Sequence, residues 1–177
     1  QVTKEVVGAP ALSDFDFTMT LTSGEMDNVK IGSGDNLTDF TDAGIKVSTS
    51  NLYDEGVQTG KEDKETVGFG DITFTAADDY TFTVVEDTTT DAAGWNYQSG
   101  ENYAKTITVH VTDENYNGQL YISVEGNNQI FTNSYAPESA TLTGDTALKV
   151  QKTVTGAPTD VDFPFGVTDR VSNLELE

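Results

Sequence analysis

The chain has 177 residues, enough for one large or two small domains with a sizeable core. It carries 9 lysines and arginines against 30 acidic residues, and the resulting net charge of -21 argues against nucleic acid or an anionic membrane surface as a partner. Cysteine is absent, which excludes disulfides, thiolate nucleophiles and cysteine–zinc sites, so an extracellular protein of this sequence needs another covalent staple.

Alternation of apolar and polar residues is the dominant pattern, and convincing helical periodicity is scarce. In chain order the alternation predicts strands at 2–7, 15–21, 44–48, 71–75, 79–87, 104–112, 119–125 and 129–135. Turn residues separate most of them, which predicts an all-β antiparallel sandwich. The region from about 24 to 68 is polar and weakly patterned, and we expect a long inserted loop there, with short extra strands or a short helix as variants.

On three of the predicted strands, the face that should turn inward carries a polar residue. Lys4 lies between Val2 and Val6 on this face, and the other two cases are Glu86 after Tyr80, Phe82 and Val84, and Asn133 between Phe131 and Tyr135. Each has a simple alternative: a lysine whose amine reaches water, an exposed acid at a strand end, and an amide bonded to nearby backbone. Because a buried polar group is costly unless it is paired, the three together predict that an amine, an acid and an amide meet.

Burial of these groups would favour their neutral forms. A neutral amine is a nucleophile, and a protonated carboxyl can donate to the Asn133 carbonyl oxygen and pass a proton to departing ammonia. The product would be an amide between Lys4 and Asn133, promoted by Glu86, that ties the first and last strands together. We expect an aromatic shell around the three residues, formed by Phe15, Phe17, Tyr80, Phe82, Phe131 and Tyr135.

The beginning of the chain recurs near its end at a constant offset of 148 (152 − 4). The recurring residues are Val2, Lys4, Val6, Gly8, Ala9, Pro10, Phe15 and Phe17, which reappear as Val150, Lys152, Val154, Gly156, Ala157, Pro158, Phe163 and Phe165. We therefore expect one domain at 1–138, and a linker with the first strands of a second, similar domain at 139–177. Lys152 matches Lys4, but its partners would lie beyond Glu177, so no bond is expected there within this chain.

Three segments, 2–8, 80–86 and 131–135, resemble in order the motifs of the pilin isopeptide-linkage domain. This domain occurs in Gram-positive pilins of the streptococcal T-antigen type and in related surface adhesins, and the resemblance covers residues 1 to about 136. It implies an immunoglobulin-like sandwich with a spontaneous bond between Lys4 and Asn133, and Glu86 as proton shuttle. It also implies an extracellular, cell-wall-anchored structure whose partners are other pilin or adhesin subunits or domains, joined in some cases by sortase.

The chain departs from this family in two respects. No lysine lies between Lys105 and Lys149, where streptococcal backbone pilins carry the lysine that sortase uses, and no LPxTG-like sorting signal occurs. Both departures argue against polymerisation through this domain. Two interpretations therefore stay open: a stalk module of a longer surface protein, and a shaft subunit of a pilus.

Other functions remain open from the sequence. An adhesin module could bind host glycan or protein through the 24–68 region or through a loop around Trp95, Tyr97 and Tyr103. Asp35, Asp39 and Asp42 could hold calcium, although a solvated acidic loop is favoured, and His110 is expected to face outward on its strand. We expect no metal, no cofactor, no membrane insertion and no turnover enzyme.

Overall fold

The structure is a computed structural model that describes residues 1–8, 14–50, 63–87, 93–114, 116–144, 147–156 and 162–166. The chain divides into two units, Gln1–Glu138 and Ser139–Glu177, which are considered separately. Within the described part of the chain, no helix is both long and apolar enough to cross a membrane.

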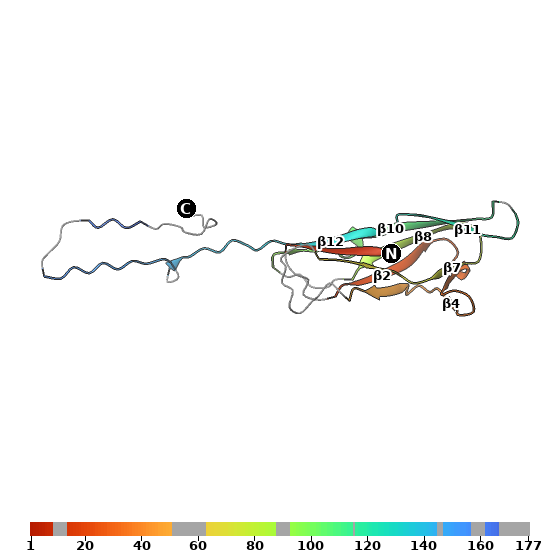
Figure 1. Ribbon diagram of the computed structural model, residues 1–177, viewed down its shortest axis with the longest axis horizontal. Helices are drawn as coiled ribbons and strands as arrows, with labels where there is room; N and C mark the ends of the chain where they lie inside the picture. The colour runs from red at the N-terminus through yellow and green to blue at the C-terminus, as the bar shows by residue number, and fades with distance from the viewer. Residues whose placement is uncertain are drawn as a thin grey trace. The chain divides into compact units, whose positions relative to one another are not determined.

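The first unit is all-β, as the alternation predicted (Figure 1). Its strands are β1 (Val2–Val7), β2 (Asp16–Ser23), β3 (Val29–Ile31), β4 (Thr38–Asp39), β5 (Ile45–Ser48), β6 (Asp63–Val67), β7 (Ile72–Phe74), β8 (Asp78–Glu86), β9 (Trp95–Asn96), β10 (Lys105–Thr112), β11 (Tyr121–Glu125) and β12 (Gln129–Tyr135). Two short 3-10 helices accompany them, η1 (Met26–Asn28) and η2 (Glu101–Tyr103).

The strands form an immunoglobulin-like sandwich. One sheet has the order β6-β1-β12-β9, the larger one has the order β11-β10-β8-β2-β5, and β4-β3-β7 form a small third sheet. Buried apolar side chains from the first two sheets, among them Val2, Phe131, Phe17 and Val84, belong to one core cluster. Hydrophobic residues alternate with polar ones along β1 and β8 because one face of each strand lies on this core.

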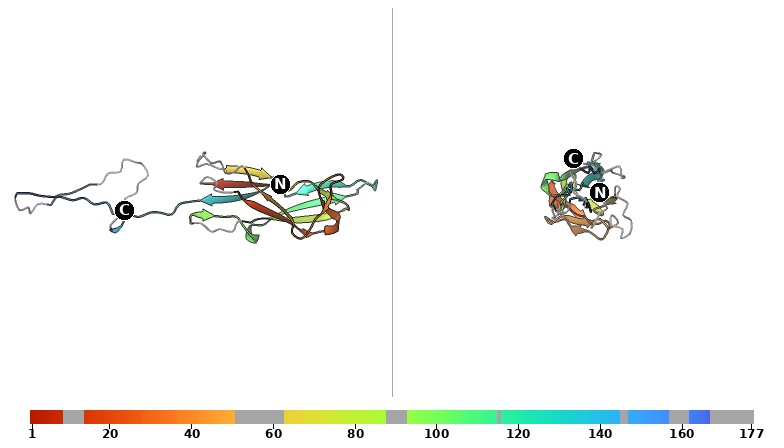
Figure 2. Two further views of the ribbon diagram at one scale, coloured as in Figure 1. Left: turned by 90° about the horizontal axis from the view of Figure 1, so that it is seen from below. Right: turned by 90° about the vertical axis from the view of Figure 1, so that its left-hand side faces the viewer.

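Among the described strands the pairing is antiparallel with one exception, which the alternation did not predict. β1 and β12 are parallel neighbours, with Lys4 opposite Phe131 and Val6 opposite Asn133. Figure 2 shows the two arrows side by side and pointing the same way, with β6 running in the opposite direction on the other side of β1. Parallel neighbours need a long crossover, and here nearly the whole domain serves as that connection.

All the strands predicted from alternation are present, with ends shifted by a residue or two. Alternation did not predict β3, β4, β6 and β9, which have 3, 2, 5 and 2 residues. Two residues, as in β4 and β9, are too few to show an alternation, β6 contains a single apolar residue, and β3 lies within the polar 24–68 region. The 24–68 region thus contains short strands, while its residues 51–62 lie outside the described part of the chain.

In the second unit, none of the described residues lies in a strand. The Lys152 Nζ atom lies 4.5 Å from the centre of the Phe163 ring, and Lys4 lies 4.5 Å from the Phe15 ring in the first unit. The repeat at an offset of 148 is thus accompanied by the same lysine–aromatic contact. Ala157 and Pro158 of the repeat fall outside the described residues, as do Ala9 and Pro10.

Candidate functional site

Lys4, Glu86 and Asn133 come together between the two main sheets. Lys4 and Asn133 lie on neighbouring strands, and because Val6 is opposite Asn133, Lys4 is its diagonal neighbour on the same face. Glu86 is the last residue of β8 and reaches them from the facing sheet. All three are fully buried, with 0% of each residue exposed. Lys4 therefore does not reach water, and Glu86 is not an exposed acid.

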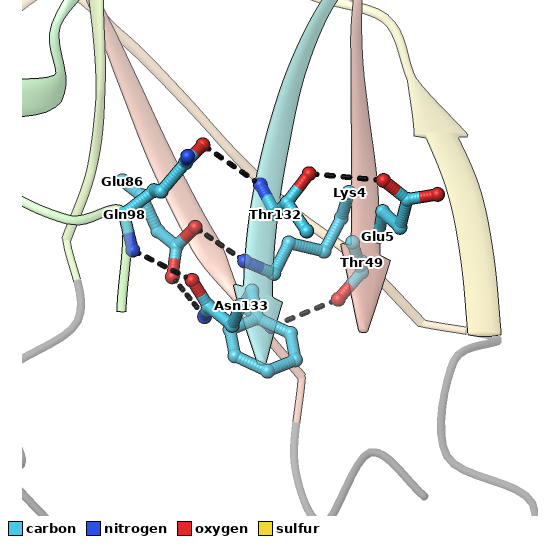
Figure 3. Close-up of polar contacts among 8 residues, drawn as sticks. Lys4, Glu5, Thr49, Glu86, Gln98, Thr132 and Asn133 are labelled. Carbon is cyan, nitrogen blue, oxygen red and sulfur yellow. Dashed lines mark hydrogen bonds and ion pairs between the residues drawn. The ribbon is translucent and has the colours of Figure 1, made fainter. Parts of the chain in front are cut away.

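The Glu86 carboxylate binds both other residues (Figure 3). Lys4 Nζ lies 2.6 Å from Glu86 Oε2, and Asn133 Nδ2 donates to Glu86 Oε1 at 2.8 Å. Two oxygens of one carboxylate thus hold the amine and the amide at the same time. Such charge-assisted hydrogen bonds inside an apolar core fix both side chains in position.

The Asn133 amide has a definite orientation because of a third contact. The backbone N–H of Gln98 donates to Asn133 Oδ1 at 2.9 Å. A backbone N–H can only donate, so the atom that faces it is the oxygen and the atom that faces Glu86 is the nitrogen. This corrects the expected contact between the carboxyl and the Asn133 carbonyl oxygen: Glu86 bonds to the amide nitrogen instead.

Aromatic side chains cover part of the site. Lys4 Nζ lies 4.5 Å from the centre of the Phe15 ring, and the Phe17 and Phe131 rings are 5.2 Å apart. Thr49, itself buried, holds Phe15 with two hydrogen bonds: the Phe15 N–H donates to Thr49 Oγ1 at 2.8 Å, and the Thr49 N–H donates to the Phe15 carbonyl at 3.0 Å. The lysine is therefore enclosed by a fixed apolar wall.

The other members of the expected shell make contacts elsewhere. Tyr80 and Phe82 share the inward face of β8 with Glu86, but at a strand rise of about 3.3 Å per residue they are roughly 20 and 13 Å further along. Tyr80 packs on Phe74 and donates its hydroxyl to Ala76. Tyr135 follows Asn133 on β12 and packs against Trp95 at 5.4 Å between ring centres. Alternation identified the correct face but gave no distance along the strand.

Comparison with known proteins shows the family of the chain. Residues 1–136 match the family described as FctA, the Spy0128-like isopeptide containing domain. The chain belongs to this family. The match confirms the resemblance that the three motifs carried.

Solved structures similar to this FctA-family chain include the major pilin from Streptococcus pyogenes, at 22% identity with a TM-score of 0.44, where 76% of this chain aligns with 49% of that one. Another is the T-13 major pilin protein from S. pyogenes serotype GAS131465, at 21% identity with a TM-score of 0.42, where 76% of this chain aligns with 51% of that one. The FctA-family chain thus spans about half the length of these pilins. No curated protein matches it.

Burial makes the lysine of this FctA-family site more reactive. Desolvation lowers the pKa of Lys4 from 10.5 to about 8, against the opposing attraction of Glu86. The lowered pKa means that the buried amine passes its proton to a neighbouring base more readily than an exposed lysine does. A neutral amine held on the same carboxylate as an amide is arranged for acyl transfer.

Two residues of the site were not predicted from the sequence. Gln98 lies in a segment without alternation, and its contact to Asn133 is made by backbone, which every residue except proline can offer. Thr49 follows β5 and resembles many surface threonines in the chain. Neither position carries a signal in a single sequence that separates it from its neighbours.

The remaining candidates make other contacts. His110 is partly exposed and contacts Asp79, with 2.7 Å between Nδ1 and Oδ1. Asp39 pairs with Lys30 at 2.8 Å, and within the described ranges no three His, Cys, Asp or Glu residues are grouped to hold a metal. Trp95 and Tyr97 stack on each other at 5.6 Å.

Proposed function

We propose that Lys4 and Asn133 condense into an intramolecular amide with Glu86 as the proton carrier, and that the domain is a covalently locked structural module of a Gram-positive pilus or surface adhesin. The observation that carries this proposal is that one buried carboxylate binds the amine and the amide nitrogen together, at 2.6 and 2.8 Å. Membership of the isopeptide family supports it independently.

The reaction balances within the three side chains. Glu86 accepts a proton from the Lys4 ammonium, and the neutral Nζ then attacks Cγ of Asn133. The carbonyl π electrons move to Oδ1, and the proton on Glu86 passes to Nδ2, the atom that it already contacts. When the carbonyl re-forms, the Cγ–Nδ2 bond breaks and ammonia leaves. The attacking nitrogen gives up its extra proton through the same carboxylate. No oxidant or cofactor takes part.

The position of this bond suits a mechanical role. Lys4 and Asn133 lie on neighbouring parallel strands, close to the two ends of the first unit. A force pulling on these ends would pass through the amide and bypass residues 5–132. By loop-closure reasoning the same bond would stabilise the fold by about 5 kcal/mol, because it encloses nearly the whole domain.

The location and partners follow from the family and the composition. A fold tied by an amide needs no cysteine, which suits a protein outside the cell. We propose a cell-wall-anchored surface structure in which neighbouring pilin or adhesin domains are the partners. Because no lysine lies between Lys105 and Lys149, a stalk module is as well supported as a shaft subunit joined by sortase.

Intact mass spectrometry of the folded wild type and of Glu86→Ala tests the proposal. We expect the wild type to be lighter than its sequence by one ammonia, and Glu86→Ala to have its full sequence mass. The matched control is Glu5→Ala. Glu5 is also an acid and lies on β1 with Lys4, but its carboxylate contacts Lys64 and Thr132 and not the Lys4 amine. The Glu5→Ala variant should therefore still lose ammonia. A wild type with full sequence mass would overturn the proposal.

A further inference from the structure

The segment around Gln98 connects the strands that carry Glu86 and Asn133. The Gln98 N–H donates to Asn133 Oδ1 at 2.9 Å, and the Gly100 N–H donates to the Glu86 carbonyl oxygen at 3.0 Å. Gly100 has a φ of 71°, in the left-handed region that favours glycine. This residue lets the segment turn back from β12 to β8. The reacting amide is therefore contacted from both sides, by Glu86 at its nitrogen and by Gln98 at its oxygen.

We infer that the backbone N–H of Gln98 is the oxyanion donor for amide formation, and that the Gln98 side chain positions it. The inference rests on the proposed function. When Lys4 Nζ attacks Cγ, negative charge develops on Asn133 Oδ1, the atom that the Gln98 N–H already contacts. A fixed donor in a dry site stabilises such charge strongly because it needs no reorganisation. Oδ1 is buried with the rest of Asn133, so water does not take this role.

The orientation of the Asn133 amide gives Glu86 and Gln98 different roles in the reaction. Glu86 Oε1 faces the amide nitrogen, so Glu86 is placed to deliver the proton with which this nitrogen leaves as ammonia. The proton that Glu86 takes from Lys4 is directed at the amide nitrogen and not at Oδ1, so a separate donor is required at the oxygen. The Gln98 N–H fills that requirement without adding a charge to the core. No proton is transferred to or from Gln98 in the reaction.

The Gln98 side chain holds this N–H in place. The ladder between β9 and β12 pairs Trp95 with Tyr135 and Asn96 with Ser134, and it ends there. Beyond it, Gln98 Oε1 accepts the Thr132 N–H at 3.1 Å, as a strand carbonyl would (Figure 3). The side chain thus extends the ladder by one contact and fixes residue 98 against Asn133. Loss of this contact should leave the N–H in the chain but let it drift from Oδ1.

Replacement of the backbone N–H by an ester oxygen tests the catalytic role. Cell-free synthesis of the full chain can insert the α-hydroxy analogue of glutamine at position 98, which keeps the side chain and removes only the donor. Samples are quenched in acid at intervals, and loss of ammonia is followed by intact mass. We expect the ester at position 98 to slow ammonia loss by about 100-fold. The matched control is an ester at Ser99, which should react at the wild-type rate.

Gln98→Ala tests the positioning role, and we expect ammonia loss slowed by about tenfold. Circular dichroism measures the folded fraction of each variant. A variant that reacts slowly only because it is partly unfolded would show this as a reduced folded fraction, whereas we expect the slower rate in protein that is fully folded. If the ester at position 98 reacts as fast as wild type, or is slowed only in proportion to its unfolded fraction, the catalytic role is wrong. If the ester variant does not fold, a folded Gln98→Ala variant with the wild-type rate overturns the inference.

These outcomes are distinct from failure of the proposed function. A wild type that never loses ammonia would contradict the Lys4–Asn133 bond itself. A wild type that loses ammonia, together with an ester variant that does so at the same rate, would contradict only the role of Gln98.

Discussion

Lys4 and Asn133 contact the two oxygens of the same carboxylate, with 2.6 Å from Lys4 Nζ to Glu86 Oε2 and 2.8 Å from Asn133 Nδ2 to Glu86 Oε1. They lie diagonally opposite on parallel neighbouring strands, and Glu86 reaches them from the facing sheet. A site of this kind requires the whole sandwich to be assembled. Amide formation should therefore follow folding, and the amide should then stabilise the folded state against unfolding.

Glu86→Ala should lower stability as well as prevent the bond. We expect the free energy of unfolding to fall by about 5 kcal/mol from loss of loop closure, with a further loss because the Lys4 amine is left buried without its acid. Denaturant unfolding monitored by circular dichroism measures this difference. Glu5→Ala, which retains the bond, is the control. Equal stabilities for wild type and Glu86→Ala would mean that no covalent tie closes the loop.

The rate of bond formation should depend on pH through the proton that Lys4 and Glu86 share. Moving this proton from the amine to the carboxyl leaves the net charge unchanged, so the reactive neutral pair is a fixed fraction of the one-proton state. The pKa of Lys4 is lowered to about 8, chiefly by desolvation, and above that pH the shared proton is lost. We therefore expect a constant rate below about pH 8 and a fall of about tenfold per pH unit above it.

The measurement uses wild-type protein purified unfolded in denaturant, before the bond can form, and then diluted into buffers from about pH 6 to 10. Loss of ammonia is followed by intact mass. A rate that rises through pH 8 would show that only a neutral amine is needed, and that Glu86 carries no proton in the reaction.

Thr49→Val should disturb the wall that encloses Lys4. Valine keeps the shape of threonine but leaves the Phe15 N–H without its acceptor, at a cost of about 1–3 kcal/mol. Displacement of Phe15 would admit water to the amine and slow bond formation. Thr49→Ser keeps the hydroxyl and is the matched control, so it should mature at nearly the wild-type rate. The contact between Thr49 and Phe15 is irrelevant to the reaction if both variants behave alike.

Single-molecule pulling on the two ends of the first unit should separate wild type from Asn133→Ala. The bond would lock the 128 residues between Lys4 and Asn133 (133 − 4 − 1). At about 3.5 Å per residue, unfolding of the variant should release roughly 450 Å that the wild type does not release. A wild type that lengthens as far as the variant would exclude the mechanical role.

Alternation predicted that Lys4, Glu86 and Asn133 meet in the core, because each is a polar residue at an inward position among apolar neighbours, and the structure brings the three together. It also placed the main strands and the all-β fold. It did not give positions along a strand, so Tyr80 and Phe82 were assigned to a shell that they do not join. Alternation did not predict the parallel pairing of β1 with β12 either, because the relative direction of two strands depends on the path of the whole chain between them.

The least predictable part of the site is the contact of Gln98 with Asn133. Its donor is a backbone N–H, which leaves no trace in residue type, and β9 is too short to show a pattern. The same contact reversed the expected orientation of the Asn133 amide. Chemistry that depends on backbone donors therefore has to be seen in the folded chain.

The most direct test of the central claim is tandem mass spectrometry of a protease digest of the folded wild type. The account predicts one branched peptide in which Lys4 Nζ is joined to Cγ of Asn133, with the mass of both segments less one ammonia. It also predicts that this peptide is absent from Glu86→Ala. Recovery of the Lys4 and Asn133 segments as two separate, unmodified peptides from the wild type would contradict it.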